Sequence, residues 1–406
     1  MTTAQVDPRL VGARPGFAGA VADFRRRLTQ GELGSLPVAF GLAVVWIYFW
    51  LENERFLSSF NLTSLVLQIA GLGTISVGIV LVLLLGEIDL SVGALSGFAA
   101  AVMAVVNVDH GWPGWLAILL ALGVGAAVGL VQGVWITKLR MPAFVVTLAG
   151  FLAWSGALLF TLGDTGSKNI RDENIVDLTG TFFSDPVSWA LAVAVMVAYV
   201  AGVVFQRARR AKAGLPLAPA RTWVVRALLV VVGLTVATAV FTDDRGLPLA
   251  AVIFGGLVVL FDLLSTRTRF GRHVYAVGGN AEAARRAGIR VDAVRVTVFT
   301  LASTLAAAGG VLLAARGRAV SQSSGGGDLL LNAIAAAVIG GTSLFGGKGS
   351  VWSALLGALV IGSIANGMDL LGQSSDVKFM VTGAVLLVAA SIDAVARRGR
   401  QAAGRA

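Results

Sequence analysis

The sequence contains no cysteine and only two histidines, His110 and His273. The lack of cysteine excludes disulfide frameworks and thiolate metal sites, and two isolated histidines argue against a histidine-based metal centre. Charged residues are also scarce, at 13% of 406 residues, whereas about a quarter of a soluble globular chain is charged. In contrast, 56% of the residues are hydrophobic and 51 are glycines. This composition predicts a polytopic membrane protein.

Apolar runs near twenty residues long are the signature of membrane-spanning helices. The chain has twelve such runs, at about 37–51, 64–86, 90–107, 115–137, 143–163, 187–205, 223–241, 247–265, 294–315, 329–345, 350–366 and 377–394. The first run is short, and the pair around Leu85 to Ser91 could be one broken or re-entrant element, so ten or eleven spans also fit. The predicted fold class is an all-α membrane protein of about twelve transmembrane helices.

The basic residues lie on one side of this arrangement. With the N-terminal tail inside, 25 of the 32 lysines and arginines fall in cytoplasmic segments and 7 in outer ones. This asymmetry indicates an even number of spans with both termini in the cytoplasm, in a bacterial cytoplasmic membrane. The net charge of +10 therefore has a topological explanation, and nucleic-acid binding loses its support.

The loops divide the chain into a tail (1–36), a transmembrane domain (37–394) and a second tail (395–406). A basic, proline-containing stretch over 206–222 predicts a flexible cytoplasmic linker. The outer loop from Asp164 to Pro186 is mildly acidic, and we expect it to contact a partner outside the membrane.

The stretch from Gly271 to Arg290, within the cytoplasmic loop 266–293, is a polar island in an apolar chain. It predicts a short helix over 281–287 that needs a partner surface, although an ordinary connector remains an alternative. Asn280 is the predicted N-cap, Glu282 the acidic residue of the first turn and Gly288 the left-handed stop. Ala283, Ala284 and Ala287 form a small face, and Arg285 and Arg286 make the last turn basic.

The sequence GEIDLSVG (86–93) places two carboxylates at a membrane boundary, where ionised groups are costly and indicate function. Glu87 and Asp89 could form a proton relay. The alternative is structural: Asp89 caps the first turn of the next span, and Glu87 faces a polar cavity.

Two other features bear on chemistry. GGTSLFGGKGS (340–350) lacks the spacing of a phosphate-binding loop and predicts a tight turn between two packed spans. Polar and aromatic residues inside spans could line a pathway or join helices; those we single out are Gln68, Thr147, Trp154, Asn332 and Asn366.

Four segments in this order resemble one family: GEIDLSVGALSG, MPAFVVTLAGFLAWSGA (141–157), RFGRHVYAVGGNAEAARRAGI (269–289) and AVIGGTSLFGGKGS. The family is the permease subunit of bacterial ABC importers for monosaccharides of the ribose, xylose, arabinose and galactose type. The resemblance covers about 60–394, and the long insert over 164–247, with two extra spans, most resembles the xylose-type permeases.

The resemblance implies a ten-helix core of the type II importer kind plus an inserted pair, and a homodimer around a central pathway. The loop over 271–290 would be the coupling helix seated on a separate ATP-binding subunit, which would bind ATP and magnesium, so this chain would hold no cofactor. An extracytoplasmic binding protein would deliver the sugar, with D-xylose favoured. The alternative is a self-sufficient, proton-coupled sugar transporter that uses Glu87 or Asp89. A membrane-embedded enzyme is disfavoured, because the sequence has no catalytic loop.

Overall fold

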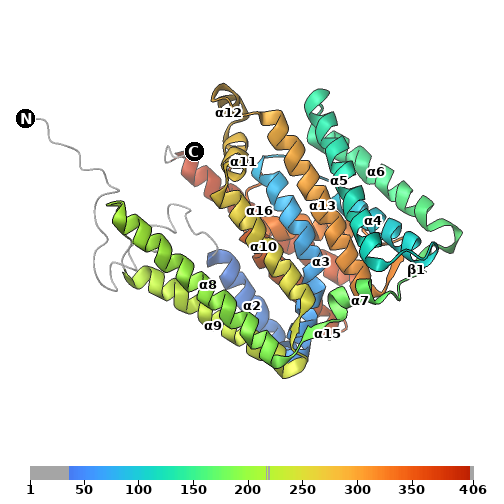
Figure 1. The fold of residues 1–406 in the computed structure, drawn as a ribbon, viewed down its shortest axis with the longest axis horizontal. Helices are drawn as coiled ribbons and strands as arrows, with labels where there is room; N and C mark the ends of the chain where they lie inside the picture. Colours follow the sequence, from blue (N-terminus) through green and yellow to red (C-terminus); the bar gives the residue numbers. More distant parts are fainter. Residues whose placement is uncertain (1–35, 216, 218–219, 403–406) are drawn as a thin grey trace, which may run out of the picture.

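The computed structural model describes residues 36–215, 217 and 220–402, and within them each predicted apolar run forms one helix. The tail predicted over 1–36 lies outside these residues except for Leu36, whereas residues 395–402 of the predicted second tail continue the last helix. The helices that correspond to the runs are α2 (Leu36–Glu52), α3 (Ser59–Leu84), α4 (Val92–Val108), α5 (Gly114–Lys138), α6 (Ala143–Leu162), α8 (Asp185–Lys212), α9 (Ala220–Asp244), α10 (Leu249–Arg267), α13 (Val291–Gly317), α14 (Gly327–Ile339), α15 (Trp352–Leu370) and α16 (Ser375–Ala402). The prediction of an all-α polytopic membrane protein is confirmed (Figure 1).

Shorter elements fill the connections. They are the helices α7 (Glu173–Gly180), α11 (Arg269–Gly279) and α12 (Ala281–Arg286), two 3-10 turns (Glu54–Leu57 and Gly163–Thr165), and the strands β1 (Ser167–Asn169), β2 (Phe182–Phe183), β3 (Leu247–Pro248) and β4 (Ala319–Ser321). The strands form two antiparallel ribbons, β1 with β4 and β2 with β3.

Length separates the helices into two groups. Among the described residues, eight helices are long and apolar enough to cross a membrane: α3, α5, α6, α8, α9, α10, α13 and α15. By contrast, α2, α4 and α14 are shorter apolar helices. The thirteen residues of α14 measure only about 20 Å at ~1.5 Å per residue. The run expected over 329–345 is thus a short helix followed by a turn.

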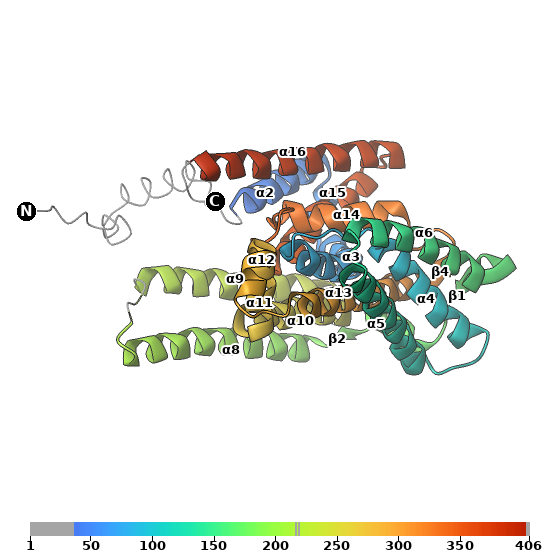
Figure 2. The same ribbon diagram turned by 90° about the horizontal axis from the view of Figure 1, so that it is seen from above.

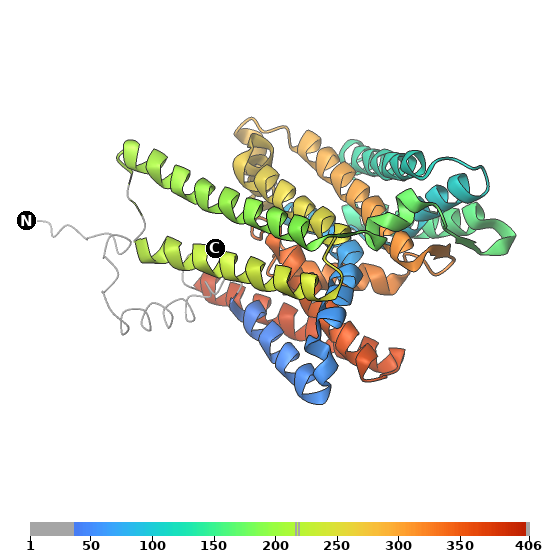
Figure 3. The same ribbon diagram turned by 60° about the horizontal axis from the view of Figure 1, so that its bottom comes forward.

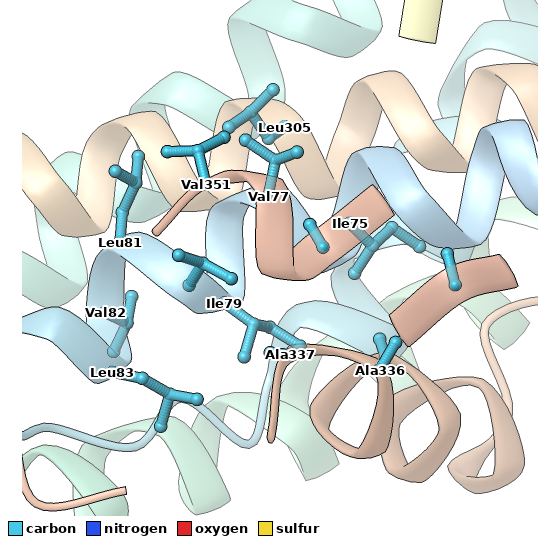
Figure 4. Close-up of a cluster of buried hydrophobic side chains, with 14 of the residues drawn as sticks. Ile75, Val77, Ile79, Leu81, Val82, Leu83, Leu305, Ala336, Ala337 and Val351 are labelled. Carbon is cyan, nitrogen blue, oxygen red and sulfur yellow. The ribbon is translucent and has the colours of Figure 1, made fainter. Parts of the chain in front are cut away.

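Helix α3 is the centre of the core, and 83% of its apolar stretch is buried. It crosses α13 in the opposite direction, because Gly71 approaches Gly309 while Gly78 approaches Ala302. Small residues at these crossings allow the two backbones to meet closely, as is usual for helices packed in lipid. Figure 4 shows side chains of α3 among Leu305 of α13 and small residues of α14.

The core is built from two similar halves that run in opposite directions. In the first half α3 is followed by the short helix α4 and then by α5; in the second, α13 is followed by the short helix α14 and then by α15. Each half packs on the other in the same way, since α13 contacts α4 and α5 while α3 contacts α14 and α15. Such inverted halves are a common plan in transporters.

Non-helical segments break both halves at equivalent places. Residues 85–91 connect α3 to α4, and residues 318–326 connect α13 to α14. The start of α4 meets the second break inside the bundle, because Gly93 of α4 lies against the carbonyl oxygen of Gly325, and Gly97 lies against Ser324. Gly325 has a φ of +74°, which favours glycine at this close approach.

Helices α8 and α9 form a long hairpin at the side of this core, which we call the inserted hairpin. They pack on each other, and α9 also contacts α3. Figures 2 and 3 show their linker end projecting past the other helices. Because α8 continues to Lys212 and α9 begins at Ala220, the linker is shorter than the expected 206–222.

Candidate functional site

The loop between α10 and α13, which the sequence predicts to be cytoplasmic, folds into two short helices. Thr268 caps the first, α11, by accepting a hydrogen bond from the Gly271 N–H at 3.2 Å. Asn280 then caps α12, because its Oδ1 accepts a hydrogen bond from the Ala283 N–H at 2.9 Å. The predicted helix and its cap are therefore confirmed. Helix α11 is an element that the sequence reasoning missed, since glycines interrupt its short polar stretch.

The end of α12 is closed by two backbone hydrogen bonds. The Gly288 N–H donates to the Arg285 carbonyl oxygen at 3.0 Å, and the Ile289 N–H donates to the Ala284 carbonyl oxygen at 3.1 Å. Gly288 has a φ of +83°, so the predicted left-handed stop is confirmed.

The exposed face of α12 is charged, with its charges paired within the loop. Glu282 lies 3.2 Å from the Nε of Arg286 and 3.5 Å from a guanidinium nitrogen of Arg285. Ala283 and Ala287 are exposed beside these pairs. Ala284, however, is buried at 5% exposure in the core of the chain itself, so the expectation that it contacts a separate subunit is wrong.

The docking loop, residues 269–290, is joined to the core through backbone contacts. Gly278 approaches the Leu84 carbonyl oxygen so closely that a Cβ atom at residue 278 would overlap it. The Gly347 N–H donates a hydrogen bond to the same oxygen at 3.0 Å. The Tyr275 hydroxyl donates to the Gly349 carbonyl oxygen at 2.9 Å. We call this meeting of α11, the end of α3 and the turn over 340–350 the glycine junction.

The predicted tight turn over 340–350 is confirmed, and the glycine junction gives a reason for its glycines. Gly346 and Gly347 have φ values of +81° and +69°, and both lie against the Gly278–Gly279 backbone. Larger residues would separate the docking loop from the core.

The carboxylates of GEIDLSVG have separate roles. Glu87 forms an ion pair with Arg295 of α13 at 2.8 Å, which joins the break after α3 to the opposite half of the core. Asp89 is buried, and its Oδ1 accepts hydrogen bonds from the Ser91 N–H and hydroxyl at 2.8 and 2.7 Å. The expected cap on the first turn of α4 is therefore corrected: Asp89 binds the residue that precedes α4, and α4 has no side-chain cap.

Around Asp89 lies a cluster of polar side chains from helices α5 and α6. The Gln132 amide of α5 donates to the Ser91 hydroxyl at 3.1 Å, and the Thr147 hydroxyl of α6 accepts a hydrogen bond from the Leu90 N–H at 3.1 Å. Trp154, also on α6, stacks on Phe98 of α4 with ring centroids 5.9 Å apart. Gln132 is six residues from the end of α5, so the cluster lies about 9 Å inside the bundle at ~1.5 Å per residue.

The other predicted polar residues do not join this cluster. Asn366 of α15 and Asn61 of α3 exchange two amide hydrogen bonds at 2.8 and 3.0 Å, so this pair joins helices. Gln68 and Asn332 are half-buried on α3 and α14. Within the described ranges, no group of three or more histidine, aspartate or glutamate side chains is placed to hold a metal ion.

The outer loop carries a structural carboxylate as well as exposed ones. Asp172 caps α7 and also accepts hydrogen bonds from Asn107 and from the Gly114 N–H, both at 3.0 Å. Partial burial acts to raise the pKa of Asp172, but hydrogen bonds from Asn107, Asn174 and Gly114 together outweigh it and lower the pKa. Glu173, Asp164 and Asp177 remain exposed.

Three residues of the site were not identified from the sequence: Arg295, Tyr275 and Gly278. Their partners lie 74 to 208 residues away along the chain, and no local pattern links them. Tyr275 and Gly278 do stand inside the polar stretch 271–290, so the stretch indicated their neighbourhood but not their role.

Comparison with known proteins agrees with the resemblance. Residues 61–390 match the family described as the permease component of branched-chain amino acid transport systems. The chain is 36% identical to the xylose transport system permease protein of Escherichia coli K12 over 359 residues, which cover 88% of this chain and 90% of that protein. It is 35% identical to the Haemophilus influenzae xylose permease, covering 87% of this chain and 94% of the relative.

A ribose import permease of Bacillus subtilis is 33% identical over 90% of this chain and 94% of its own length. No solved structure matches the chain. The family match over 61–390 covers both halves of the core, the breaks, the docking loop and the inserted hairpin. The chain therefore belongs to this family of transport-system permeases, as a multi-pass subunit of a sugar ABC importer in the cytoplasmic membrane, and it is a transport component and not an enzyme.

Proposed function

We propose that this permease imports D-xylose, using ATP hydrolysis on a separate subunit. Two xylose permeases are 36% and 35% identical to this chain, whereas the ribose permeases of Bacillus subtilis and Escherichia coli are 33% and 30% identical. The order of identities favours xylose over ribose. The family favours an ATP-driven importer over the proton-coupled alternative, and ATP and magnesium would bind to the partner subunit.

The glycine junction is the observation that carries the proposed coupling. A partner that moves the docking loop pushes on Gly278, which is in backbone contact with the end of α3 and with the turn before α15. The same displacement would therefore be transmitted to both halves of the core. The Glu87–Arg295 ion pair lies next to this junction in the chain and connects the first break to α13.

The proposed assembly places a partner on each side of the membrane. The ATP-binding subunit would seat on α11 and α12, and an extracytoplasmic sugar-binding protein would dock on the exposed carboxylates of the loop over 164–186. Two copies of the permease would enclose the pathway. Exposed apolar side chains along α6, such as Phe144, Leu152 and Phe160, support a surface of this kind next to the polar cluster around Asp89.

The docking surface can be tested by co-purification with the ATP-binding subunit. Ala283 is exposed on α12, so Ala283→Trp should block docking by steric overlap while the amount of permease recovered from membranes stays normal. Arg286→Glu should weaken docking by reversing an exposed charge. Ala208→Trp, on an exposed position of α8, is the matched control and should keep the partner. Full co-purification and full transport in Ala283→Trp would contradict the docking role.

The substrate and the energy source are tested in proteoliposomes that contain the permease, the ATP-binding subunit and the binding protein. Labelled D-xylose should accumulate only with internal ATP, and unlabelled xylose should compete better than ribose or fructose. Preferential competition by ribose would identify ribose, and not xylose, as the substrate. Uptake by the permease alone, driven by a pH gradient, would instead establish the proton-coupled alternative.

A further inference from the structure

The linker end of the inserted hairpin concentrates positive charge. We call residues 206–226 the hairpin tip. The tip carries six basic residues and no aspartate or glutamate. Arg209, Arg210 and Lys212 are exposed in the last turns of α8, and Arg226 is exposed near the start of α9. The charge of the tip is therefore not balanced within its own sequence.

The docking loop is also basic, but two of its arginines lie beside a carboxylate of their own helix. Arg285 and Arg286 pair with Glu282, and Arg295 pairs with Glu87. In the part of the chain that the structure describes, no carboxylate forms an ion pair with Arg209, Arg210 or Lys212. Unlike the paired Arg285 and Arg286, these basic residues of the tip are therefore available to an anionic partner from outside the chain.

Helix length places these charges at a membrane surface. The apolar stretch of α8 from Val187 to Phe205 spans about 28 Å at ~1.5 Å per residue, close to the ~30 Å hydrocarbon core of a bilayer. Arg207 then lies at the boundary, and Arg209 to Lys212 extend into the headgroup region. The Arg207 guanidinium stands 5.3 Å from the centre of the Trp223 ring of α9, and tryptophan favours this interfacial depth.

Below the tip, both helices expose apolar surface. Only 11% of the apolar stretch of α8 and 17% of that of α9 is buried, against 83% for α3. Large side chains such as Val197, Leu228 and Leu229 are exposed along the two helices. Figure 2 shows that the hairpin stands apart from the core at this end. Acyl chains can therefore lie along the helices directly beneath the basic residues.

We propose that the hairpin tip is a binding site for anionic phospholipids, whose phosphate groups contact Arg209, Arg210 and Lys212 while their chains cover α8 and α9. Basic side chains attract anionic lipids at a bilayer surface, and the attraction adds up over neighbouring charges. The exposed apolar surface selects a lipid over a soluble anion. The inserted hairpin thereby anchors the permease to acidic lipid on its cytoplasmic side.

The test compares two matched variants of the full-length permease. Arg209→Gln/Arg210→Gln removes two adjacent arginines from the last turns of α8, and Arg285→Gln/Arg286→Gln removes two adjacent arginines from the last turn of α12. Each purified protein is equilibrated with equal mole fractions of phosphatidylglycerol and phosphatidylcholine in mixed micelles. Native mass spectrometry then measures the ratio of the two retained lipids.

The wild type and the α12 variant should both retain phosphatidylglycerol in excess. The α8 variant should lose this preference by about tenfold or more, because each basic side chain contributes a factor of about five at an anionic surface. Equal lipid ratios in the wild type and the α8 variant would overturn the proposal, and so would an equal loss in both variants. An unchanged lipid ratio with loss of the ATP-binding subunit in the α8 variant would assign the tip to a protein partner instead.

Discussion

The repeated core and the inserted hairpin use the same apolar residue types in two different ways. In the core, glycines bring backbones together: an added Cβ at Gly310 of α13 or Gly357 of α15 would meet the backbone of α4 or α14. In the hairpin, Gly202 and Gly233 have no atom within 4 Å of the position that a Cβ would occupy. Apolar composition alone therefore does not distinguish a helix that packs on protein from one that faces lipid.

The two regions also differ in how they are attached. Breaks, glycine crossings and long-range polar pairs join the halves of the core along their length. The hairpin is held mainly at the end away from its tip, where Ser59 donates a hydrogen bond to Asp243 at 2.6 Å and the Arg245 guanidinium stands 5.8 Å from the centre of the Phe60 ring of α3. We therefore expect substitutions in the core to affect folding and coupling, and comparable substitutions in the hairpin to be tolerated.

The largest difference should appear between Gly310→Val and Gly233→Val. Valine at 310 has no room next to the Ser96 backbone, and overpacking of this kind costs about 1–3 kcal/mol or more. Valine at 233 enters open space and should change stability by no more than about 0.5 kcal/mol. Thermal unfolding of both purified variants in the same lipid measures the difference. Equal destabilisation would refute the distinction between core and hairpin.

A second comparison uses two neighbouring glycines of α11. Gly278→Ala introduces strain of about 1–3 kcal/mol at the glycine junction, whereas Gly279→Ala meets no atom within 4 Å. We expect Gly278→Ala to insert and bind the ATP-binding subunit but to lower sugar uptake per ATP hydrolysed severalfold. Gly279→Ala should behave like the wild type. Normal uptake per ATP in Gly278→Ala would show that the junction does not transmit motion.

The amide pair of α3 and α15 allows a third comparison between the core and the hairpin. Asn366→Leu leaves the buried Asn61 amide without its partner, at a cost of about 1–3 kcal/mol. The double variant Asn61→Leu/Asn366→Leu should recover part of this loss, because no buried amide is left unpaired. Thr235→Leu in α9 should cost less, since the exposed Thr235 hydroxyl bonds to its own helix at Val231 at 2.8 Å and reaches α8 only through a long contact to the Met196 sulfur at 4.0 Å. Thermal unfolding measures the stability of each variant. A double variant that loses as much stability as the two single variants together would show that the two amides do not stabilise each other.

The smallest effect concerns the attachment of α7 to the outer end of the core. The hydrogen bonds that lower the pKa of Asp172 favour the ionised carboxylate in the folded state. Its contribution to stability is therefore fully present above the ordinary aspartate pKa and is lost as pH falls through the lowered value. Hydrogen exchange of α7 should rise at acidic pH in the wild type. In Asp172→Ala it should already be raised at neutral pH, while Glu173→Gln should follow the wild type.

The exposed acidic residues of this loop are predicted to act on docking and not on folding. Glu173→Gln should make binding of the sugar-binding protein less sensitive to salt, because screening weakens interactions between exposed charges. Asp172 is unsuited to that experiment, since its replacement also loosens α7. An unchanged salt dependence would remove Glu173 from the interface.

The helices were predictable because membrane helices are encoded locally, by runs of apolar residues of the required length. The cap at Asn280 and the stop at Gly288 were predictable for the same reason, since each acts on backbone groups a few residues away. Boundaries were less certain: α8 extends to Lys212 because charged residues also form helix beyond the hydrocarbon core.

The contacts that join distant segments were not predictable. Glu87 stood out at a membrane boundary, but nothing in the sequence marked Arg295 as its partner, and only the folded core brings them within 2.8 Å. Ala284 was assigned to a contact with a separate subunit because three alanines at helical spacing do not reveal which side faces the chain itself. Asp172 was grouped with its acidic neighbours, although its partners at Asn107 and Gly114 make it a structural residue.

The breaks at residues 85–91 and 318–326 also have a consequence for biosynthesis. Non-helical backbone is tolerated at membrane depth only where protein surrounds it. The start of α4, directly after the first break, meets the second break at Gly325, which the ribosome adds more than 230 residues after Ser91. At about 5–20 residues per second, this interval lasts roughly 10–50 s. Until α14 emerges, the first break must be sheltered by α5 and α6 alone, so the permease acquires its final arrangement only when translation is nearly complete.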